Sequence, residues 1–334
     1  MTKIIGFGIL GMGHIGKRHA QEINSNPFSE LIGYSDPQIH EFQINGSTFC
    51  SSSIEDLISS KSVDVVNVCT PNGLHAEHAL IALNHGKHVI IEKPMTLSTK
   101  EAKLLTESAM QNDRKVFCVM QNRYSPVVQW LKSVLDEKVL GEIYNIHIQC
   151  AWNRDDRYYK PNHWHGTLEL DGGPLYTQFS HFIDVIYWLF GSVEITYTEF
   201  FNFNHKHNTE FEDSGRFHFI TQQMAQGSFH YTTSVYNRNL ESSLQIIAQN
   251  GSIQIGGQYM NHVNYCDIKN YVPPSLPESP APNQYPGYQG SASNHAQVIQ
   301  NCIDVLNHNQ PIDTPISDGF EVVKLIETIY LKRF

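Results

Sequence analysis

Three closely spaced glycines near the start of the chain restrict most strongly what this sequence can fold into. An apolar run over residues 4–10 leads into Gly11, Gly13 and Gly16, in the spacing G-x-G-x-x-G. Such a run is typical of a buried parallel strand. Gly11 allows a tight turn, Gly13 lets a pyrophosphate approach the backbone, and Gly16 lets the following helix pack closely on the strand. A helix that begins near His14 would direct its free N–H groups at phosphate, so the motif predicts a dinucleotide cofactor.

A carboxylate after the second predicted strand indicates which dinucleotide binds. The strand over residues 30–35 is followed by Asp36, twenty residues after Gly16. An acid at that spacing can accept hydrogen bonds from both ribose hydroxyls of NAD. It would repel the 2′-phosphate of NADP by about 1–4 kcal/mol, and Pro37 and Gln38 supply no cation. We therefore expect NAD; the alternative is that Asp36 is only a turn residue before Pro37.

The length, charge and cysteine content of the chain limit the kinds of protein that it could be. A chain of 334 residues is too long for one typical core, so we expect two domains. The formal charge of −10 argues against a nucleic-acid partner. Six cysteines without a C-x-x-C pair suit reduced thiols and predict no metal site. No signal-peptide cleavage site or long apolar span is visible, so we expect a cytoplasmic protein without a membrane partner.

The first 120 residues alternate strand and helix patterns with short connections, which predicts a doubly wound parallel sheet. We assign residues 1–121 to an NAD-binding Rossmann domain. Ser98 and Glu101 form a capping-box pattern that predicts a helix ending near Gln111. The other expected strands cover residues 63–69, 87–91 and 116–120, and another expected helix covers residues 74–85.

The pattern then changes to longer alternating runs, which predict an open, mainly antiparallel sheet in a second α/β domain over residues 122–334. Asn250-Gly251 indicates a hairpin. Residues 271–290 contain six prolines and predict a surface loop, either at a site rim or as a plain connector. Two closing helices, residues 294–307 and 317–332, could pack back on the first domain. Aromatic residues on both faces of residues 227–236 favour a homo-oligomer, a dimer or tetramer.

Two segments carry groups suited to proton transfer. Lys93 directly follows the strand ending at Ile91, and parallel strands deliver their carboxyl ends to the ligand crevice. Its amine could donate to a substrate hydroxyl; the alternative is a surface lysine. His181 lies near the start of an apolar helix after Gly172-Gly173, with Asp184 one turn later. His181 suits general-base chemistry near neutrality, whereas the alternative is a buried histidine paired with Asp184.

The order of these motifs resembles the Gfo/Idh/MocA family of sugar and cyclitol dehydrogenases. The resemblance rests on the glycine fingerprint, Thr70-Pro71-Asn72 with His75, Glu92-Lys93-Pro94, and Gly172-Gly173 leading to His181-x-x-Asp184. It spans nearly the whole chain. A narrower set looks like the bacterial UDP-N-acetyl-2-amino-2-deoxyglucuronate 3-dehydrogenases: Asn122-Arg123-Tyr124, Trp152-Asn153-Arg154, Tyr158-Tyr159, Trp164-x-Gly166, Glu212-Asp213-Ser214-Gly215 and Asn239-Leu240-Glu241.

The resemblance assigns roles to particular residues. It makes Lys93 and His181 catalytic, and it implies that the Lys93–Pro94 peptide is cis. Many members carry aspartate four residues before the histidine; here Thr177 stands there, which puts a Lys–Asp–His relay in doubt. Arginine often follows the tryptophan at 164, where this chain has His165. The expected cofactor-binding residues are Gly11, Gly13, His14, Ile15, Gly16, Asp36, Thr70, Asn72, His75, Glu92, Lys93, Gln121 and Trp164.

Cations and aromatic residues of the second domain are candidates for the substrate. Guanidinium groups suit a diphosphate or carboxylate, and aromatic rings can stack on a base or sugar; each could equally be structural. The expected set is Arg154, Arg157, Tyr158, Tyr159, Thr177, Gln178, Arg238 and Asn239. The resemblance implies NAD-dependent oxidation of a secondary hydroxyl, at C3, of a nucleotide-activated sugar such as UDP-N-acetylglucosaminuronate. The alternatives are a dehydrogenase of a free sugar, sugar phosphate or inositol, and a non-catalytic regulator that senses NAD or a sugar.

Overall fold

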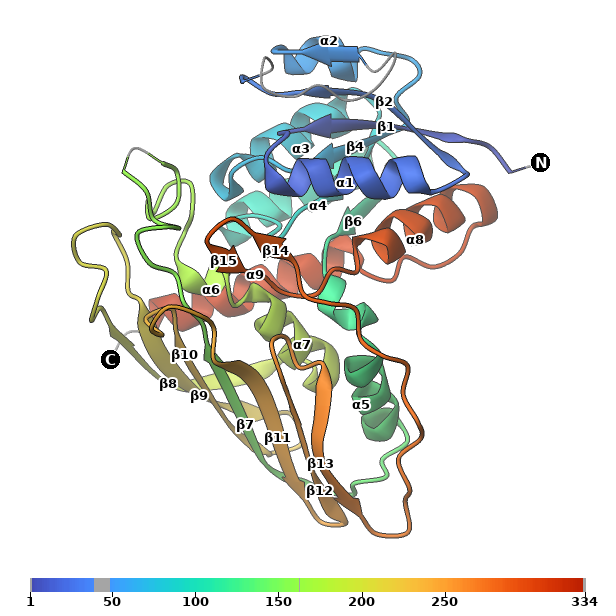
Figure 1. The fold of residues 1–334 in the computed structure, drawn as a ribbon. Coiled ribbons are helices and arrows are strands. Elements are labelled where there is room, and N and C mark those ends of the chain that lie inside the picture. The colour runs from blue at the N-terminus through green and yellow to red at the C-terminus, as the bar shows by residue number, and fades with distance from the viewer. Residues whose placement is uncertain (1, 39–48, 162, 333–334) are drawn as a thin grey trace. The chain divides into compact units, whose positions relative to one another are not determined.

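The computed structural model describes residues 2–38, 49–161 and 163–332. Contacts along the chain divide it into two units (Figure 1). The first comprises Met1–Met120 with His295–Val323, and the second comprises Gln121–Asn294 with Lys324–Phe334. Each unit is described by itself below. Within the described residues, no helix is both long and apolar enough to cross a membrane.

The first unit is built on a six-stranded parallel sheet in the order β3-β2-β1-β4-β5-β6. The strands are β1 (Ile5–Leu10), β2 (Ser29–Ser35), β3 (Phe49–Ser51), β4 (Val65–Val68), β5 (His88–Ile91) and β6 (Val116–Cys118). Every residue of β1 and β4 is buried, as continuous apolar runs require in a sheet covered on both faces. The strand order reverses between β1 and β4, and ligands of such sheets bind at the carboxyl ends beside this reversal.

Helices connect these strands. They are α1 (His14–Ser25), α2 (Ile54–Ile58), α3 (His75–Asn84), preceded by the 3-10 turn η2 (Asn72–Leu74), and α4 (Thr99–Gln111). The predicted capping box is confirmed, because the Glu101 N–H donates to Ser98 Oγ (3.2 Å) and Ser98 Oγ donates to the Glu101 carboxylate (3.0 Å). A late helix, α8 (His295–His308), belongs to this unit and packs on α1.

The second unit contains a seven-stranded sheet in the order β13-β12-β11-β7-β10-β9-β8. Its strands are β7 (Ile143–Ala151), β8 (Val193–Phe201), β9 (Ser214–Thr221), β10 (Gln226–Thr232), β11 (Glu241–Ala248), β12 (Gly251–Gly256) and β13 (His262–Ile268). Only β7 and β10 run parallel among these described pairs; the others are antiparallel. The expected mainly antiparallel second sheet is therefore confirmed.

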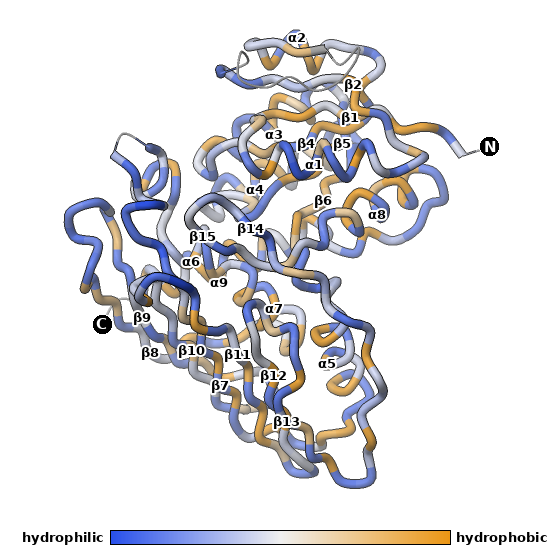
Figure 2. The backbone as a smooth tube through the Cα atoms, viewed as in Figure 1, coloured by the Kyte–Doolittle hydropathy of each residue, from blue (hydrophilic) through white to orange (hydrophobic). Residues whose placement is uncertain are grey.

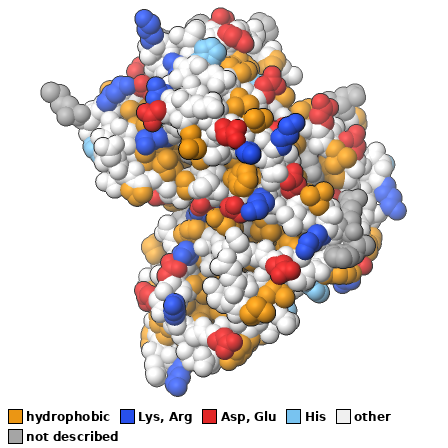
Figure 3. All heavy atoms as spheres, turned by 180° about the vertical axis from the view of Figure 1, so that it is seen from behind, with side chains coloured by type: hydrophobic (Ala, Val, Ile, Leu, Met, Phe, Trp, Pro, Cys, Tyr) orange, Lys and Arg blue, Asp and Glu red, His pale blue; other side chains and the backbone are white. Residues whose placement is uncertain are grey.

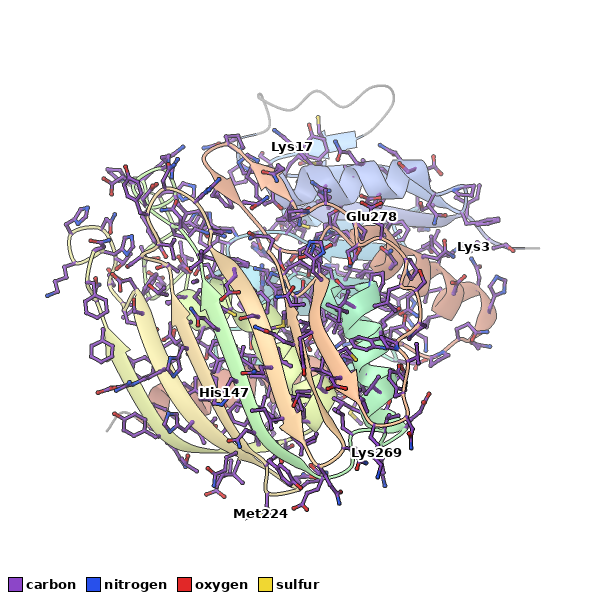
Figure 4. All side chains as sticks on the ribbon, turned by 60° about the horizontal axis from the view of Figure 1, so that its bottom comes forward. Lys3, Lys17, His147, Met224, Lys269 and Glu278 are labelled. Atoms are coloured by element: carbon purple, nitrogen blue, oxygen red, sulfur yellow. The ribbon has the colours of Figure 1, made fainter. Side chains whose placement is uncertain are left out.

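One face of this sheet is apolar and packed, and the alternation along its strands is visible in Figure 2. Ile146, Ile148 and Cys150 of β7 are buried, and the Phe217 and Phe229 rings stack at 4.9 Å. The intervening side chains point the other way, as His147 does on β7 (Figure 4). The packed face is covered within the unit by α7 (Ser180–Phe190), whose Phe182 contacts the Trp152 ring beyond β7.

The remaining elements are η3 (Gln121–Tyr124), α5 (Pro126–Asp136) and α6 (Pro174–Thr177). The helix α9 (Ile316–Leu331) begins in the first unit and ends in the second.

Three expectations need correction. The hairpin between β11 and β12 is present, but Ala248 pairs with Gly251, so its loop is Gln249-Asn250. The strand expected over residues 227–236 ends at Thr232, and Tyr236 lies beyond it, 93% exposed. Tyr236 therefore gives no support to an apolar second sheet face. The proline-rich segment is partly regular: β14 (Gln284–Tyr285) and β15 (Tyr288–Gln289) form a small hairpin.

Candidate active site

The turn after β1 has the shape that a pyrophosphate needs. Gly11 has a φ of +86°, which L side chains rarely adopt. A Cβ on Gly16 would lie 2.0 Å from the Gly11 carbonyl oxygen, whereas a Cβ on Gly13 would meet no atom within 4 Å. The backbone at Gly13 is therefore open to an approaching group. Gly13 makes no side-chain cap to α1, and the N-terminus of such a helix suits the binding of phosphate.

Asp36 lies at the end of β2, beside this turn. Its Oδ2 accepts the Met12 N–H at 2.7 Å, and its Oδ1 accepts the Gln38 N–H at 2.8 Å. Each carboxylate oxygen has a second lone pair that remains able to accept a ribose hydroxyl. The same side chain thus fixes the glycine turn, a role that the sequence spacing alone did not indicate. His14 and Lys17 are exposed in the first turn of α1, and Figure 4 labels Lys17 there.

The loop after β4 holds the next group of predicted cofactor residues. Thr70 Oγ1 hydrogen-bonds His78 Nδ1 at 2.9 Å, and Asn72 is buried at the start of η2. His75 is only 1% exposed. Its two ring nitrogens lie 2.7 Å from the Pro94 carbonyl oxygen and 2.8 Å from the Thr70 carbonyl oxygen. His75 therefore connects two loops of the sheet edge and presents almost no surface itself.

Lys93 follows β5 at the same edge of the sheet. Its side chain is half-buried, and its peptide bond to Pro94 is cis, as the resemblance implies. The Lys93 N–H donates to Glu92 Oε2 at 3.1 Å. The carboxyl end of a parallel strand thus presents this amine in the region where the sheet binds ligands.

Glu92 is held beneath Lys93 by two histidines that sequence reasoning missed. Glu92 Oε1 lies 2.9 Å from His19 Nε2 and 3.4 Å from His295 Nε2, and all three side chains are buried. Burial by itself raises the pKa of Glu92, but the hydrogen bond from His19 and the close approach of His295 outweigh it and hold the pKa well below its usual value. His295 lies 203 positions after Glu92, so no local pattern could have paired them.

These same three residues form the one group, among residues the structure describes, whose ligand atoms could reach a common metal ion. The 2.9 Å separation between His19 Nε2 and Glu92 Oε1 is an ordinary hydrogen-bond length. His19 Nδ1 also lies 2.7 Å from the Asn67 side-chain nitrogen, which lets Nδ1 accept and Nε2 donate. We therefore interpret this group as a hydrogen-bonded support for Glu92.

In the second unit, His181 lies in the first turn of α7 and is 6% exposed. Asp184, one turn later, accepts hydrogen bonds from Arg123 Nε at 3.0 Å and Nη2 at 2.6 Å. This buried two-point contact gives Asp184 a partner that its spacing from His181 did not suggest. Arg123 also lies 5.6 Å from the Trp188 ring, which fixes η3 against α7.

A carboxylate does lie beside Thr177. Thr177 Oγ1 donates to the Asp171 carbonyl oxygen at 2.9 Å and also contacts the Asp171 carboxylate. Asp171 is fully buried and accepts the Gly166 N–H at 2.8 Å. Burial, followed by the charge of Asp171, raises the pKa values of Tyr158 and Tyr159 well above their usual range. Thr177 is therefore held by a buried carboxylate that lies six residues earlier in the chain.

Arg154 is enclosed by aromatic rings. Its guanidinium carbon lies 4.9 Å from the Trp152 ring, 5.2 Å from Tyr158 and 4.8 Å from Tyr288. It donates to the Asn153 and Gln289 carbonyl oxygens at 2.6 and 3.1 Å. Burial lowers its pKa. Arg154 thus fastens the β14–β15 hairpin, and Gln178 Nε2, 3.1 Å from Tyr158 Oη, extends the cluster to the end of α6.

The other expected residues of this unit differ in exposure. Arg157 pairs with Asp155 at 2.7 Å and donates to the Asn237 carbonyl oxygen, and Arg238 is exposed. Asn239 accepts from the Asn153 N–H at 2.8 Å. The Trp164 ring stacks on His165 at 3.8 Å. Gln121 is buried, with its carbonyl accepting from Asn294.

The comparisons identify the family. Residues 5–120 match the oxidoreductase family with an NAD-binding Rossmann fold, and residues 128–254 match the GFO/IDH/MocA C-terminal domain. The chain is a member of the Gfo/Idh/MocA family. Its first unit is an NAD-binding Rossmann domain, and the glycine turn and Asp36 fit that cofactor.

Two solved structures resemble the whole chain. The WlbA dehydrogenase from Bordetella pertussis, in complex with NADH and UDP-GlcNAcA, has 26% identity and a TM-score of 0.87 over 98% of this chain and 96% of that one. WlbA from Chromobacterium violaceum, with the same ligands, has 27% identity and a TM-score of 0.85, covering 99% and 94%.

Curated relatives match over shorter stretches. Glucose-6-phosphate 3-dehydrogenase of Bacillus subtilis is 32% identical over 57% of this chain and 55% of its own length. The 2,7-anhydro-N-acetylneuraminate hydratase of Escherichia coli is 30% identical over 58% and 52%. The matched regions span between 33% and 63% of the length of these and the other first relatives.

Proposed function

We propose that this protein is an NAD-dependent dehydrogenase that oxidises the C3 hydroxyl of a nucleotide-activated sugar such as UDP-N-acetylglucosaminuronate. The observation that carries this proposal is the similarity, along almost the whole chain, to two dehydrogenase structures that contain NADH and UDP-GlcNAcA. The relative that acts on glucose 6-phosphate is also a 3-dehydrogenase by name, which supports the position of oxidation.

The chemistry requires a base and a hydrogen-bond donor at one secondary alcohol. When bound at the glycine turn, NAD supplies the hydride acceptor. His181 removes the hydroxyl proton, since imidazole is suited to general-base work near neutral pH. Lys93 donates a hydrogen bond to the oxygen on which negative charge develops. Such groups contribute roughly 10²–10⁴-fold each to the rate.

The negative charge of the substrate requires cations, for which Arg157 and Arg238 are the exposed candidates of the second unit. Trp164 and His165 offer a stacked pair of rings for a base or sugar. Acidic and basic side chains are interspersed on the face shown in Figure 3. We place the reaction in surface polysaccharide biosynthesis in the cytoplasm and expect a homo-oligomer, which sedimentation can test.

The experiment is to follow NADH formation at 340 nm with UDP-N-acetylglucosaminuronate, glucose 6-phosphate and myo-inositol. We expect turnover with the sugar nucleotide, and NMR of the product should show a ketone at C3. Lys93→Met and His181→Asn should each lower kcat at least 100-fold, whereas Lys103→Met on the exposed side of α4 should not. Turnover only with unactivated sugars would favour the first alternative. NAD binding without any turnover would favour a sensor.

A further inference from the structure

The segment that carries Lys93 is tied down on both sides by buried side chains. On one side, Glu92 accepts the Lys93 N–H and is held by His19 and His295. On the other side, the Pro94 carbonyl oxygen lies 2.7 Å from His75 Nδ1. Lys93 is thus a half-buried residue between two fixed neighbours.

We propose that His75 is a positioning residue for Lys93: it ties the loop after β5 to the loop after β4, and so fixes the direction in which the amine leaves the sheet. His75 does this from the first residue of α3, with its other ring nitrogen 2.8 Å from the Thr70 carbonyl oxygen. The proposal rests on the proposed function, because it gives a role to Lys93 in that reaction.

The burial of the His75 ring distinguishes a positioning role from direct contact with the cofactor. At 1% exposure, the His75 ring offers no surface to a dinucleotide or a sugar. Both of its partners are backbone carbonyls, which only accept hydrogen bonds. A neutral ring donates to one carbonyl and a protonated ring donates to both. In either state, removing the ring takes at least one donor away from these two carbonyls and frees the Lys93 segment from the loop after β4.

Such a residue is useful because a hydrogen-bond donor stabilises a developing negative charge only when it is placed precisely. A misplacement of about 1 Å can lower a rate by roughly 100-fold. A lysine side chain has four rotatable bonds, so its useful direction depends on a fixed backbone. The loss of His75 should therefore lower kcat and leave the binding of NADH unchanged.

The test uses the full-length protein with His75→Leu, which lacks both donors, and His75→Gln, whose amide can still donate. His85→Leu, an exposed histidine at the far end of the same helix, is the matched control. We expect His75→Leu to lower kcat 10- to 100-fold with the NADH dissociation constant changed less than threefold. His75→Gln should recover most of kcat, and His85→Leu should match the parent protein.

A second readout does not depend on turnover. Amide hydrogen exchange of peptides covering residues 92–96, without cofactor, should be at least tenfold faster in His75→Leu than in the parent protein. Peptides from α4 and β1 should be unchanged. The proposal is overturned if exchange stays the same at residues 92–96, if it rises across the whole first unit, or if NADH affinity falls with kcat. If the parent protein turned over no sugar at all, the proposed function would fail, while the exchange result would still decide the role of His75.

Discussion

The three glycines of the first turn serve different physical purposes, and the structure separates them. Gly11 is required by its positive φ, and Gly16 by the Gly11 carbonyl against which a side chain would press. Gly13 has an ordinary φ of −68° and open space around it, so the protein itself does not require a glycine there. We therefore propose that a glycine is needed at position 13 for the approach of the ligand.

This difference gives a paired prediction. Gly13→Ala should change the free energy of unfolding by less than about 1 kcal/mol but weaken NADH binding at least tenfold, because the methyl group fills the approach to the backbone. Gly16→Ala should destabilise the fold by about 1–3 kcal/mol, because the new carbon meets backbone. Thermal unfolding and NADH fluorescence titration measure the two effects. Equal destabilisation by both substitutions would contradict this assignment.

Among the secondary-structure elements, strand β5 sets where the residues directly after it, Glu92 and Lys93, are placed. The strand begins with His88, whose Nδ1 accepts the Lys115 N–H at 3.0 Å, and it ends at Ile91, next to Glu92 and Lys93. Buried parallel pairing with β4 and β6 fixes where the strand ends. Backbone pairing of β5 therefore sets the position of Glu92 and Lys93, and the surrounding side chains set the direction of the chain there.

His88 makes the stability of the first unit dependent on pH. Burial, followed by the nearby charges of Arg114 and Lys115, lowers the pKa of His88 from its usual 6.5 to about 4. The unfolded chain therefore binds a proton at His88 more readily than the folded protein does. The contribution of His88 to the free energy of unfolding is fully present above pH 6.5 and is lost as the pH drops from 6.5 to 4. Burial lowers the pKa values of His75 and His295 as well, which adds to the same slope.

Urea unfolding at pH values between 7 and 4 measures this slope. His88→Gln keeps an acceptor for the Lys115 N–H without a group that titrates here, so it should lose less stability than the parent protein over this range. His147→Gln, on the exposed face of the second sheet, should retain the parent slope. If His88→Gln loses as much stability on acidification as the parent protein does, the burial of His88 is not the cause.

At the scale of the molecule, the first unit is discontinuous in sequence. Residues near 315 extend the sheet beyond β6, where the Cys118 N–H donates to the Thr314 carbonyl oxygen at 2.9 Å. Helix α8 packs on α1, with Asn26 donating to Gln300 at 2.7 Å. The unit thus takes part of its core and one of its sheet edges from the end of the chain.

We predict that residues 1–120 alone do not form a stable unit. Joining them to residues 295–323 through a short flexible linker should restore cooperative unfolding and resistance to protease, because α8 covers α1 and His295 reaches Glu92 again. A short linker suffices, since Asn294 donates to the Gln121 carbonyl oxygen at 3.0 Å. Circular dichroism during heating compares the two chains; equal midpoints would contradict the prediction.

Features that depend on neighbouring residues could be predicted from the sequence. The glycine spacing, the buried runs of β1 and β4, the capping box at Ser98 and the position of Lys93 after a strand all follow from neighbouring residues, so the Rossmann unit and its cofactor could be predicted. The mainly antiparallel second sheet was also predictable, because period-two alternation is a local signal.

Contacts between side chains that are distant in the sequence became known from the folded chain. His19 of α1, Glu92 after β5 and His295 of α8 come from three separate parts of the chain. Likewise, Tyr288 of β15 meets Arg154 and Tyr158, which both belong to the segment after β7. Such contacts form between residues that are tens or hundreds of positions apart in the chain. No local spacing in the sequence predicts which of these residues will meet. The position of Lys93 could therefore be predicted from a local motif, whereas the side chains that support it are brought together by packing.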